Sequence, residues 1–384
     1  MIVVASSLVL AALPLFMVGG LAVQIKDDFA LSETGLGAAA TIGFVVGALF
    51  APIGGRLADR IGPKTSIYVG TSMSVVSLAG LGLLTDGWGT LVGFLCLAGV
   101  GVAMVDPGLA ILVNRAFPVR RQGLAFGVKE ASIPAATLAA GIAVPTIALT
   151  VGWRWAFSIG LIPWLVILIL LPTVPTGAPV PRPEAEPDDR AHRRDPPRRA
   201  ALVMAAAAAA FGTGAASGVG IFLTDSAVAM GSSPAAAGLL LAVGSVAGII
   251  TRVGSGVIAD RSGGPQFRLI SIMLAVGAVT MALGGTGVTW LLVVGTVGAF
   301  TGGWAWTGIF FLSLVKTFPD RPGAVAGIGT LGLGIGNAAG PLIFGVVAQT
   351  TSFGVAWLVA GLLAAVGSVL MAMTRRRFSG VSVE

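Results

Sequence analysis

The sequence is short of the residues from which most enzyme sites are built. It has one cysteine, Cys96, and one histidine, His192, so neither an intramolecular disulfide nor a cysteine–histidine metal site can form. The phosphate-binding motif G-x-x-x-x-G-K-[ST] is absent, which excludes that route to nucleotide binding. Charged residues make up only 10% of the chain. These shortages argue against an enzyme, and we expect no cofactor and no metal.

Apolar residues dominate the chain instead. Hydrophobic residues reach 55% of the 384, with 57 glycines and a mean hydropathy of +0.96, which leaves too little polar surface for a soluble protein of this length. Runs such as LVGFLCLAGVGVAMV and LLVVGTVGAF belong to segments long enough to cross a hydrocarbon core, which takes about 20 helical residues. Backbone polar groups in lipid must be satisfied within each segment, so we expect an all-α membrane protein.

The places where charge interrupts the apolar pattern predict twelve transmembrane helices. Their expected ranges are 3–24, 34–55, 66–85, 88–113, 123–149, 154–172, 201–224, 235–258, 268–285, 288–314, 323–348 and 353–373. The first range begins almost at Met1 with no basic region before it, which favours a retained helix over a cleaved signal peptide.

The placement of lysine and arginine predicts the orientation. Nineteen of the 23 basic residues fall in the connections after the even-numbered helices and in the C-terminal tail, whereas the opposite side holds only Lys26 and Arg154. The positive-inside rule then places both termini in the cytoplasm, and we expect a multi-pass protein of the cell (inner) membrane. The same distribution accounts for the net charge of +7 without a nucleic-acid partner, because no basic domain with interleaved aromatic residues exists.

One segment breaks the helical pattern. Residues 173–199 are rich in proline and in charges of both signs, and they cannot bury enough apolar area to fold. We interpret them as a cytoplasmic linker, and a solvated tether is favoured over a regulatory segment. The linker divides the predicted helices six and six, into bundles at 1–172 and 200–384.

The two halves repeat each other. Adding 201 to the number of a residue near the end of the second helix gives its counterpart near the end of the eighth. The matched residues are Gly43, Gly47, Gly55, Asp59, Arg60 and Gly62 with Gly244, Gly248, Gly256, Asp260, Arg261 and Gly263. FPVRRQGLAFG from Phe117 likewise parallels FPDRPGAVAG from Phe318. Two duplicated six-helix bundles with a site between them are the layout of a secondary transporter that alternates access.

The repeated stretch also carries a family resemblance. GRLADRIGPK, from Gly55 to Lys64, resembles the cytoplasmic signature loop of the major facilitator superfamily, and the second copy occupies the equivalent loop. Pro63 departs from the family, which usually has a basic residue there. The resemblance implies a latch that holds the cytoplasmic side closed while the carrier opens outward; otherwise these residues are topology determinants and solvated turns. The implied latch consists of Gly55, Asp59, Arg60, Gly62, Lys64, Asp260 and Arg261.

Four ionisable residues lie inside the predicted helices, where each costs about 2.5–3.5 kcal/mol on insertion scales and so needs a partner or a cavity. Asp106 and Lys129 lie at similar depth on neighbouring antiparallel helices, which predicts an ion pair between them as one reading. Glu130 follows Lys129 directly and should point about 100° away from it. It either takes up a proton during transport or pairs with an arginine at the cytoplasmic rim. The candidate arginines there are Arg115, Arg120 and Arg121.

The fourth residue, Arg252, cannot lose its proton and needs a carboxylate, helix carbonyls or a bound anion as its partner. Its place four residues before Gly256 resembles that of the anion-binding arginine of monocarboxylate and oxalate–formate carriers, although Gly248 stands where those usually have an aspartate. The sequence leaves both a substrate contact and a local salt bridge open.

A second resemblance bears on the substrate. RRQGLAFGVKEASIP, which leads into the fifth helix, resembles the cyanate and nitroimidazole-type permease branch of the superfamily. Two marks of proton-driven multidrug antiporters are missing, since the chain has no arginine near Leu95 and has Ile133 where those have a glycine before Pro134. The comparison favours a small solute, and multidrug or metabolite efflux remains the alternative.

The predicted function is therefore secondary active transport of a small organic or inorganic monoanion, with or without a coupled proton. Arg252 and Lys129 would neutralise the anion, while Asp106 or Glu130 would carry the proton or pair in the empty state. Weaker candidates for substrate binding are Trp304, Trp306 and Asn337. The expected partners are the substrate, protons and the bilayer, and we expect the protein to work as a monomer.

Overall fold

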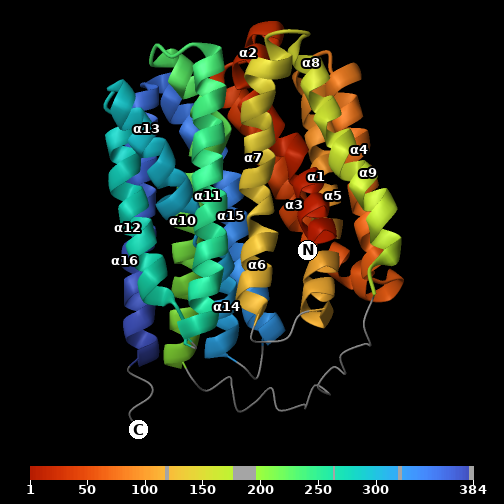
Figure 1. Cartoon of the computed structure of the whole chain (residues 1–384). Helices are drawn as coiled ribbons and strands as arrows, with labels where there is room; N and C mark the ends of the chain where they lie inside the picture. Colours follow the sequence, from red (N-terminus) through yellow and green to blue (C-terminus); the bar gives the residue numbers. More distant parts are fainter. Residues whose placement is uncertain (117–120, 176–195, 263, 319–321, 380–384) are drawn as a thin grey trace.

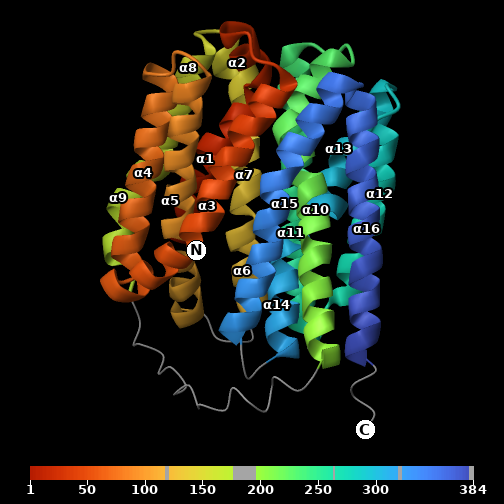
Figure 2. The same cartoon turned by 180° about the vertical axis from the view of Figure 1, so that it is seen from behind.

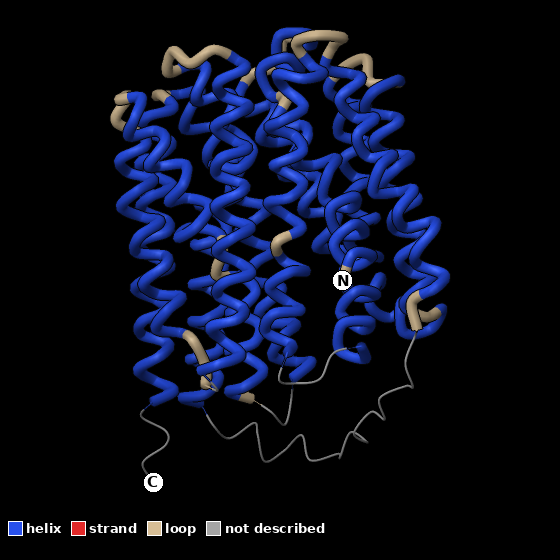
Figure 3. The backbone as a smooth tube through the Cα atoms, viewed as in Figure 1, coloured by secondary structure: helices blue, strands red, loops and turns tan. Residues whose placement is uncertain are grey.

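The chain folds into helices. A computed structural model describes residues 1–116, 121–175, 196–262, 264–318 and 322–379, and within these ranges the regular structure is helical throughout (Figure 3). Twelve helical stretches are long and apolar enough to cross a membrane. The predicted all-α fold with twelve spans is confirmed.

The helices break at several points within the spans. In chain order they are α1 (Ile2–Gly20), α2 (Ala22–Phe29), α3 (Glu33–Ile61), α4 (Pro63–Leu83), α5 (Trp88–Ala116), α6 (Gln122–Glu130), α7 (Ser132–Ala143), α8 (Trp153–Ala156), α9 (Leu161–Leu170), α10 (Pro196–Ala229), α11 (Pro234–Ser262), α12 (Phe267–Gly284), α13 (Thr289–Gly298), α14 (Thr307–Thr317), α15 (Pro322–Thr350) and α16 (Phe353–Ser379). Two π-helical segments, Val144–Ala148 and Ala299–Trp304, lie within the fifth and tenth spans.

The helices form two groups that stand side by side, α1 to α9 and α10 to α16 (Figures 1 and 2). In the first group α5 packs on α3 and α4, and in the second α10 packs on α15 and α16. The groups meet where α3 contacts α15, where α6 and α7 contact α11, and where α1 contacts α10. The repeat is visible in the helices, because α3 and α11 both have 29 residues and start 201 positions apart.

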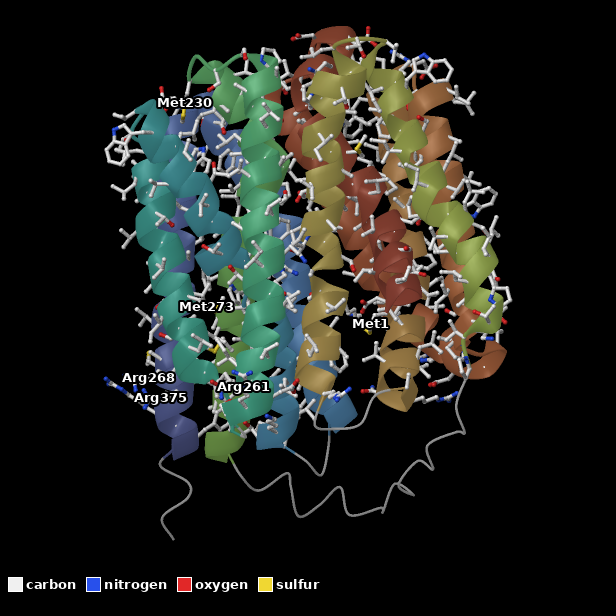
Figure 4. The ribbon with its side chains drawn as sticks, viewed as in Figure 1. Met1, Met230, Arg261, Arg268, Met273 and Arg375 are labelled. Atoms are coloured by element: carbon white, nitrogen blue, oxygen red, sulfur yellow. The ribbon has the colours of Figure 1, made fainter. Side chains whose placement is uncertain are left out.

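The two ends of the molecule differ in charge. We call the end where α9 finishes and α10 begins the linker end, and the opposite one, with α2 and α8, the far end (Figure 1). Arg261, Arg268 and Arg375 lie toward the linker end, whereas Met230 lies at the far end (Figure 4). Most of the predicted linker, 173–199, falls outside the described residues, and α10 begins at Pro196, earlier than predicted.

The stretches expected to be loops after the second and eighth spans are helical. The prediction that the second span ends at residue 55 is wrong, since α3 continues to Ile61, and α11 likewise continues to Ser262. A helix of 29 residues is about 43 Å long, so its last turns project beyond a hydrocarbon core of about 30 Å and can carry arginines. The turn itself is Gly62, with φ of 87°, a conformation that favours glycine.

Backbones touch directly where α6 and α7 cross α11, a contact that we call the seam. A Cβ atom built on Gly256 would lie 2.5 Å from the carbonyl oxygen of Gly123, and one built on Gly141 would lie 2.6 Å from that of Gly238. Between these points the hydroxyl groups of Thr137 and Ser245 are 2.7 Å apart. Small residues allow this close approach, which holds the two groups together from the linker end toward the far end.

Candidate functional site

Four charged side chains form one chain of contacts in the middle of the molecule. The Lys129 ammonium lies 2.5 Å from an Asp106 carboxylate oxygen and 3.1 Å from Glu130 Oε1. Glu130 Oε2 in turn lies 3.5 Å from Nη1 of Arg252. The order is negative, positive, negative, positive, so each inner group has an opposite charge on both sides. We call these four residues the charge chain.

The charge chain connects both groups of helices. Asp106 is on α5, Lys129 and Glu130 are at the end of α6, and Arg252 is on α11. The Thr307 hydroxyl at the start of α14 donates a 3.2 Å hydrogen bond to Glu130 Oε2. Glu130 therefore contacts residues from both halves of the sequence.

A proline explains why Arg252 reaches this point. In a regular helix the carbonyl of Glu130 would accept a hydrogen bond from residue 134, but Pro134 has no N–H group. Arg252 Nη1 donates to that carbonyl at 2.6 Å, and Nη2 donates to the carbonyl of Trp304 at 3.1 Å, where the π-helical segment of the tenth span ends. One guanidinium thus satisfies two carbonyls on opposite sides of the seam.

An aromatic side chain covers the charge chain at Arg252. The guanidinium lies 5.6 Å from the centroid of the Trp304 ring, within the range of a cation–π contact. Trp304 also packs against Phe300 and, across the two groups of helices, against Phe16 of α1 at a centroid distance of 5.4 Å. Arg252 Nε is buried without a hydrogen-bond partner among the described residues. This end is sealed by packing.

The opposite end of the charge chain, at Asp106, is exposed. The side chain of Asp106 is 45% exposed, whereas those of Lys129, Glu130 and Arg252 are only 6%, 9% and 1% exposed. Of the four side chains Asp106 is the exposed one, and Lys129 lies buried directly beside it. Arg252 can be reached only after the residues that cover it have moved.

The structure tests the local contacts that the sequence predicted for these residues. The predicted ion pair of Asp106 with Lys129 is confirmed. The prediction that Glu130 points away from Lys129 is wrong, because both side chains are long and flexible enough to meet at the end of α6. The Glu130 carboxylate lies in the buried charge chain, with Lys129 and Arg252 as its charged neighbours. Of the rim arginines considered as its partners, Arg120 lies outside the described residues. Arg252 combines helix carbonyls with a carboxylate, two of the partners that its chemistry allowed.

The weaker candidates lie in different surroundings. Trp304 contacts Arg252, but the fully buried Trp306 donates its indole N–H to the carbonyl of Gly303 at 2.7 Å and packs edge-on against Phe310. Trp306 therefore belongs to the core of the second group of helices. Asn337 is half-buried on α15. The next residue, Ala338, accepts a hydrogen bond at its carbonyl from the Thr41 hydroxyl of α3.

The implied latch residues have separate surroundings too. Both carboxylate oxygens of Asp260 accept backbone hydrogen bonds from the first turn of α6, from Gly123 at 2.8 Å and from Leu124 at 2.9 Å. A carboxylate at a helix N-terminus is favourable because it pairs with unsatisfied N–H groups and with the helix dipole. This contact joins α11 to α6 across the two groups at the linker end.

In the first copy of the motif, the contact of Lys64 stays within one group of helices. Lys64 donates to the carbonyl of Pro172 at 2.9 Å, which ties α4 to the end of the sixth span within the first group. Asp59, Arg60 and Arg261 have exposed side chains. A Cβ atom on Gly55 would have nothing within 4 Å among the described residues. The two copies of one motif therefore meet different neighbours.

A second charged cluster was missed at the sequence level. Lys26 of α2 contacts Glu33 of α3 and Asp225 of α10 at the far end. The predicted seventh span ended at residue 224, which left Asp225 outside it, whereas α10 runs on to Ala229. The signal that could have revealed it is an aspartate inside a helix that continues without a break through FLTDSAVA. In the described residues no three histidine, cysteine or carboxylate side chains converge as a metal site would need.

Twelve spans, a duplicated half and a buried charge chain between the halves are a layout expected of membrane transport proteins. The sequence matches the Major Facilitator Superfamily over residues 4–312, and the chain belongs to that family. The family and the fold are those of transporters.

Two curated relatives are similar to the chain in sequence, and one solved structure is similar to it in fold. The chain is 31% identical over 127 residues to the MFS-type transporter Rv1250 of Mycobacterium tuberculosis, covering 32% of this chain and 22% of that protein. It is 30% identical over 150 residues to the hexuronate transporter of Bacillus subtilis, covering 38% and 34% of the two chains. The matches thus span at most about a third of these relatives. A crystal structure of a D-xylose–proton symporter has the same fold, with a TM-score of 0.76 at 18% identity over 96% of this chain and 95% of that one.

Proposed function

We propose that the protein is a proton-coupled carrier of a small organic or inorganic monoanion in the cell membrane. The helices of residues 1–172 and 200–384 would move against each other as half-domains, with the binding site between them and both termini in the cytoplasm. The protein would work as a monomer, driven by ion gradients.

The observation that carries this proposal is the charge chain. Its two carboxylates and two cations sum to zero, and three of the four groups are buried. Buried charges are costly unless each has a counter-charge, so an uncompensated extra anion at this site would be strongly disfavoured. A proton that arrives with the anion keeps the total charge at zero. The arrangement favours uptake of an anion and a proton together.

Lys129 is the first cation that such an anion would meet, because it adjoins the exposed Asp106. A proton on the Glu130 carboxylate would weaken its attraction for both Lys129 and Arg252, so that the ammonium becomes available to the substrate. Arg252 would then act as a positioning residue, since its two hydrogen bonds to backbone carbonyls hold α6 and the tenth span in place. Asp106 would pair with Lys129 in the empty state.

Other features are consistent with this assignment. The hexuronate transporter is named for a substrate that carries a carboxylate, so a matching relative handles an organic anion. The contact of Asp260 with the start of α6 joins the halves at the linker end, and its rupture would accompany opening there. Trp304 and Asn337 would contribute to the walls of the site. We leave Trp306 out because it packs within one half.

The experiment is a flux assay on the full chain in proteoliposomes, with a panel of monocarboxylates, cyanate and nitrite, and with or without an inward proton gradient. We expect one class of monoanion to accumulate only with the gradient. Glu130→Gln should abolish this accumulation but retain exchange of the anion, and Lys129→Gln should lose both. Arg154→Gln is the control, because Arg154 pairs with Asp28 at the exposed far end. Gradient-driven flux of lipophilic cations, unaffected by Lys129→Gln, would instead establish the efflux alternative.

A further inference from the structure

One lysine at the far end connects the two halves of the molecule. The Lys26 ammonium lies 2.7 Å from Glu33 Oε1 in its own half and 2.8 Å from Asp225 Oδ2 on α10 in the other half. We call Lys26, Glu33 and Asp225 the far-end cluster. Because α2 is a short helix set off from α1 at Leu21, its lysine is directed at the boundary between the halves.

The cluster lies next to a closely packed crossing of α1 and α10. The Thr224 hydroxyl, next to Asp225 in the chain, donates a 2.8 Å hydrogen bond to the carbonyl of Gly19. A Cβ atom on Gly19 would lie 2.8 Å from the Cα atom of Ile221. Separation of the halves at this end must therefore break both the packing at Gly19 and the bridge from Lys26 to Asp225.

The cluster is unbalanced in charge. Two carboxylates share one ammonium, and the side chains of Asp225 and Lys26 are only 8% and 14% exposed. Burial by itself would lower the pKa of Lys26, but hydrogen bonds to Asp225 and Glu33 outweigh it and hold the pKa above its ordinary value. The lysine therefore stays charged, and any change of charge within the cluster must occur on a carboxylate.

The other charged groups near Asp225 do not supply a second cation. Asp27, the next residue to Lys26, is exposed and adds negative charge close to Asp225. Asp28 pairs with Arg154. From α15, Gln349 faces α3 with its side-chain oxygen accepting the N–H group of Thr34, and the Phe353 ring of α16 lies 6.0 Å from the Lys26 ammonium. Among the described residues Lys26 is the cation that compensates Asp225, so the bridge between the halves depends on the charge of one carboxylate.

We propose that Asp225 is a proton-binding site that controls opening at the far end, a role separate from substrate binding in the charge chain. When ionised, Asp225 holds Lys26 and joins the halves. When a proton from the adjoining water binds its carboxylate, Lys26 keeps its own proton and remains paired with Glu33 alone. The ion pair between the halves is then lost, only a hydrogen bond from the ammonium to a neutral carboxyl group can remain, and the halves separate more readily. A fall in pH on that side shifts the carrier toward its far-end-open form.

The test measures that separation directly. Spin labels on Thr150→Cys and Thr286→Cys, one exposed far-end position in each half, report the distance between the halves in the full-length Cys96→Ser protein by pulsed electron resonance. As the pH falls from 8 to 5 we expect the ratio of long to short distances to rise, by up to about tenfold for each unit by which the open form binds the proton more tightly. Asp225→Asn should show the long distance at both pH values.

The matched control is Asp27→Asn, which removes an acidic group from the same surface but no contact between the halves. It should keep the short distance at pH 8 and still respond to pH, with the midpoint moved to lower pH because a negative charge close to Asp225 is gone. Lys26→Gln, which breaks the bridge from the other side, should also favour the long distance at pH 8, so the test does not depend on one variant folding. The proposal is overturned if Asp225→Asn and Lys26→Gln keep the short distance at pH 8, or if the parent distances do not change with pH.

Discussion

The shortest hydrogen bond of the Arg252 guanidinium, 2.6 Å, goes to the backbone carbonyl of Glu130, while the Glu130 carboxylate lies farther away at 3.5 Å. Arginine and glutamate are thus joined through the main chain as well as through their charges. The consequence is mechanical: displacement of the Glu130 side chain by a ligand or a proton need not release Arg252 from α6. The contact of Arg252 with the Glu130 carbonyl, which connects the halves, can therefore persist while the Glu130 carboxylate changes its charge or its partner.

This arrangement predicts that lysine cannot replace Arg252. A guanidinium can donate to two carbonyls at once, whereas an ammonium on a flexible stem has no fixed fork. We expect Arg252→Gln to lower the free energy of unfolding by about 3–5 kcal/mol, because Glu130 is left buried without that partner, and Arg252→Lys to recover only part of the loss. Unfolding in mixed detergent micelles measures both. Arg154→Gln, at the exposed far-end pair, should cost at most about 1 kcal/mol.

The Asp260 contact predicts a local effect on hydrogen exchange. Asp260→Ala removes the acceptor for the backbone N–H groups of Gly123 and Leu124, and loss of such a cap costs about 1 kcal/mol. The two amides should exchange about fivefold faster, as mass spectrometry of the peptide that starts α6 would show. Arg261→Ala, the exposed neighbour, should leave their exchange unchanged. Equal rates in Asp260→Ala and the parent protein would show that the contact does not form in solution.

The repeated glycines predict unequal effects of one substitution. Gly256→Ala would place a methyl group 2.5 Å from the Gly123 carbonyl oxygen, and such overpacking costs about 1–3 kcal/mol. Gly55→Ala, at the equivalent position of the first repeat, meets nothing within 4 Å among the described residues and should be neutral or stabilising by up to about 1 kcal/mol. Thermal unfolding of the two variants in detergent compares them. A larger loss for Gly55→Ala would contradict the packing described for α11.

The raised pKa of Lys26 predicts how stability depends on alkaline pH. A cation whose folded-state pKa lies above its ordinary value of 10.5 stabilises the folded form fully below that value, and this contribution is lost as the pH rises through the folded pKa. Between about pH 8 and pH 10 the melting temperature of the parent protein should therefore exceed that of Lys26→Gln by a constant margin, and the margin should shrink above pH 10. A margin independent of pH up to 12 would show that the lysine acts by packing alone.

Hydropathy and charge were enough to predict the spans, because membrane insertion imposes a length and a composition on each helix. The ion pair of Asp106 with Lys129 was also predictable, since two opposite charges at one depth have few other partners in lipid. The hydrogen bond from Arg252 to the Glu130 carbonyl was not predicted. The sequence does show its cause, because Pro134, four residues after Glu130, has no N–H group to donate to that carbonyl. The ends of α3, α10 and α11 were missed because hydropathy marks where the lipid ends, and a helix can continue beyond it. Asp225 was missed for this reason, because it lies on α10 just beyond the predicted end of the seventh span.

The seam also bears on which positions of the chain can vary. At Gly123, Gly141, Gly238 and Gly256 the joint is made by main-chain atoms, whose shape is the same whatever residues stand nearby. In the transport cycle that we propose, side chains that face a solute could be exchanged without reshaping this contact between the halves. Selection for a different substrate and conservation of the contact between the halves would then act on different residues, so that substrate specificity could change while the contact stays the same.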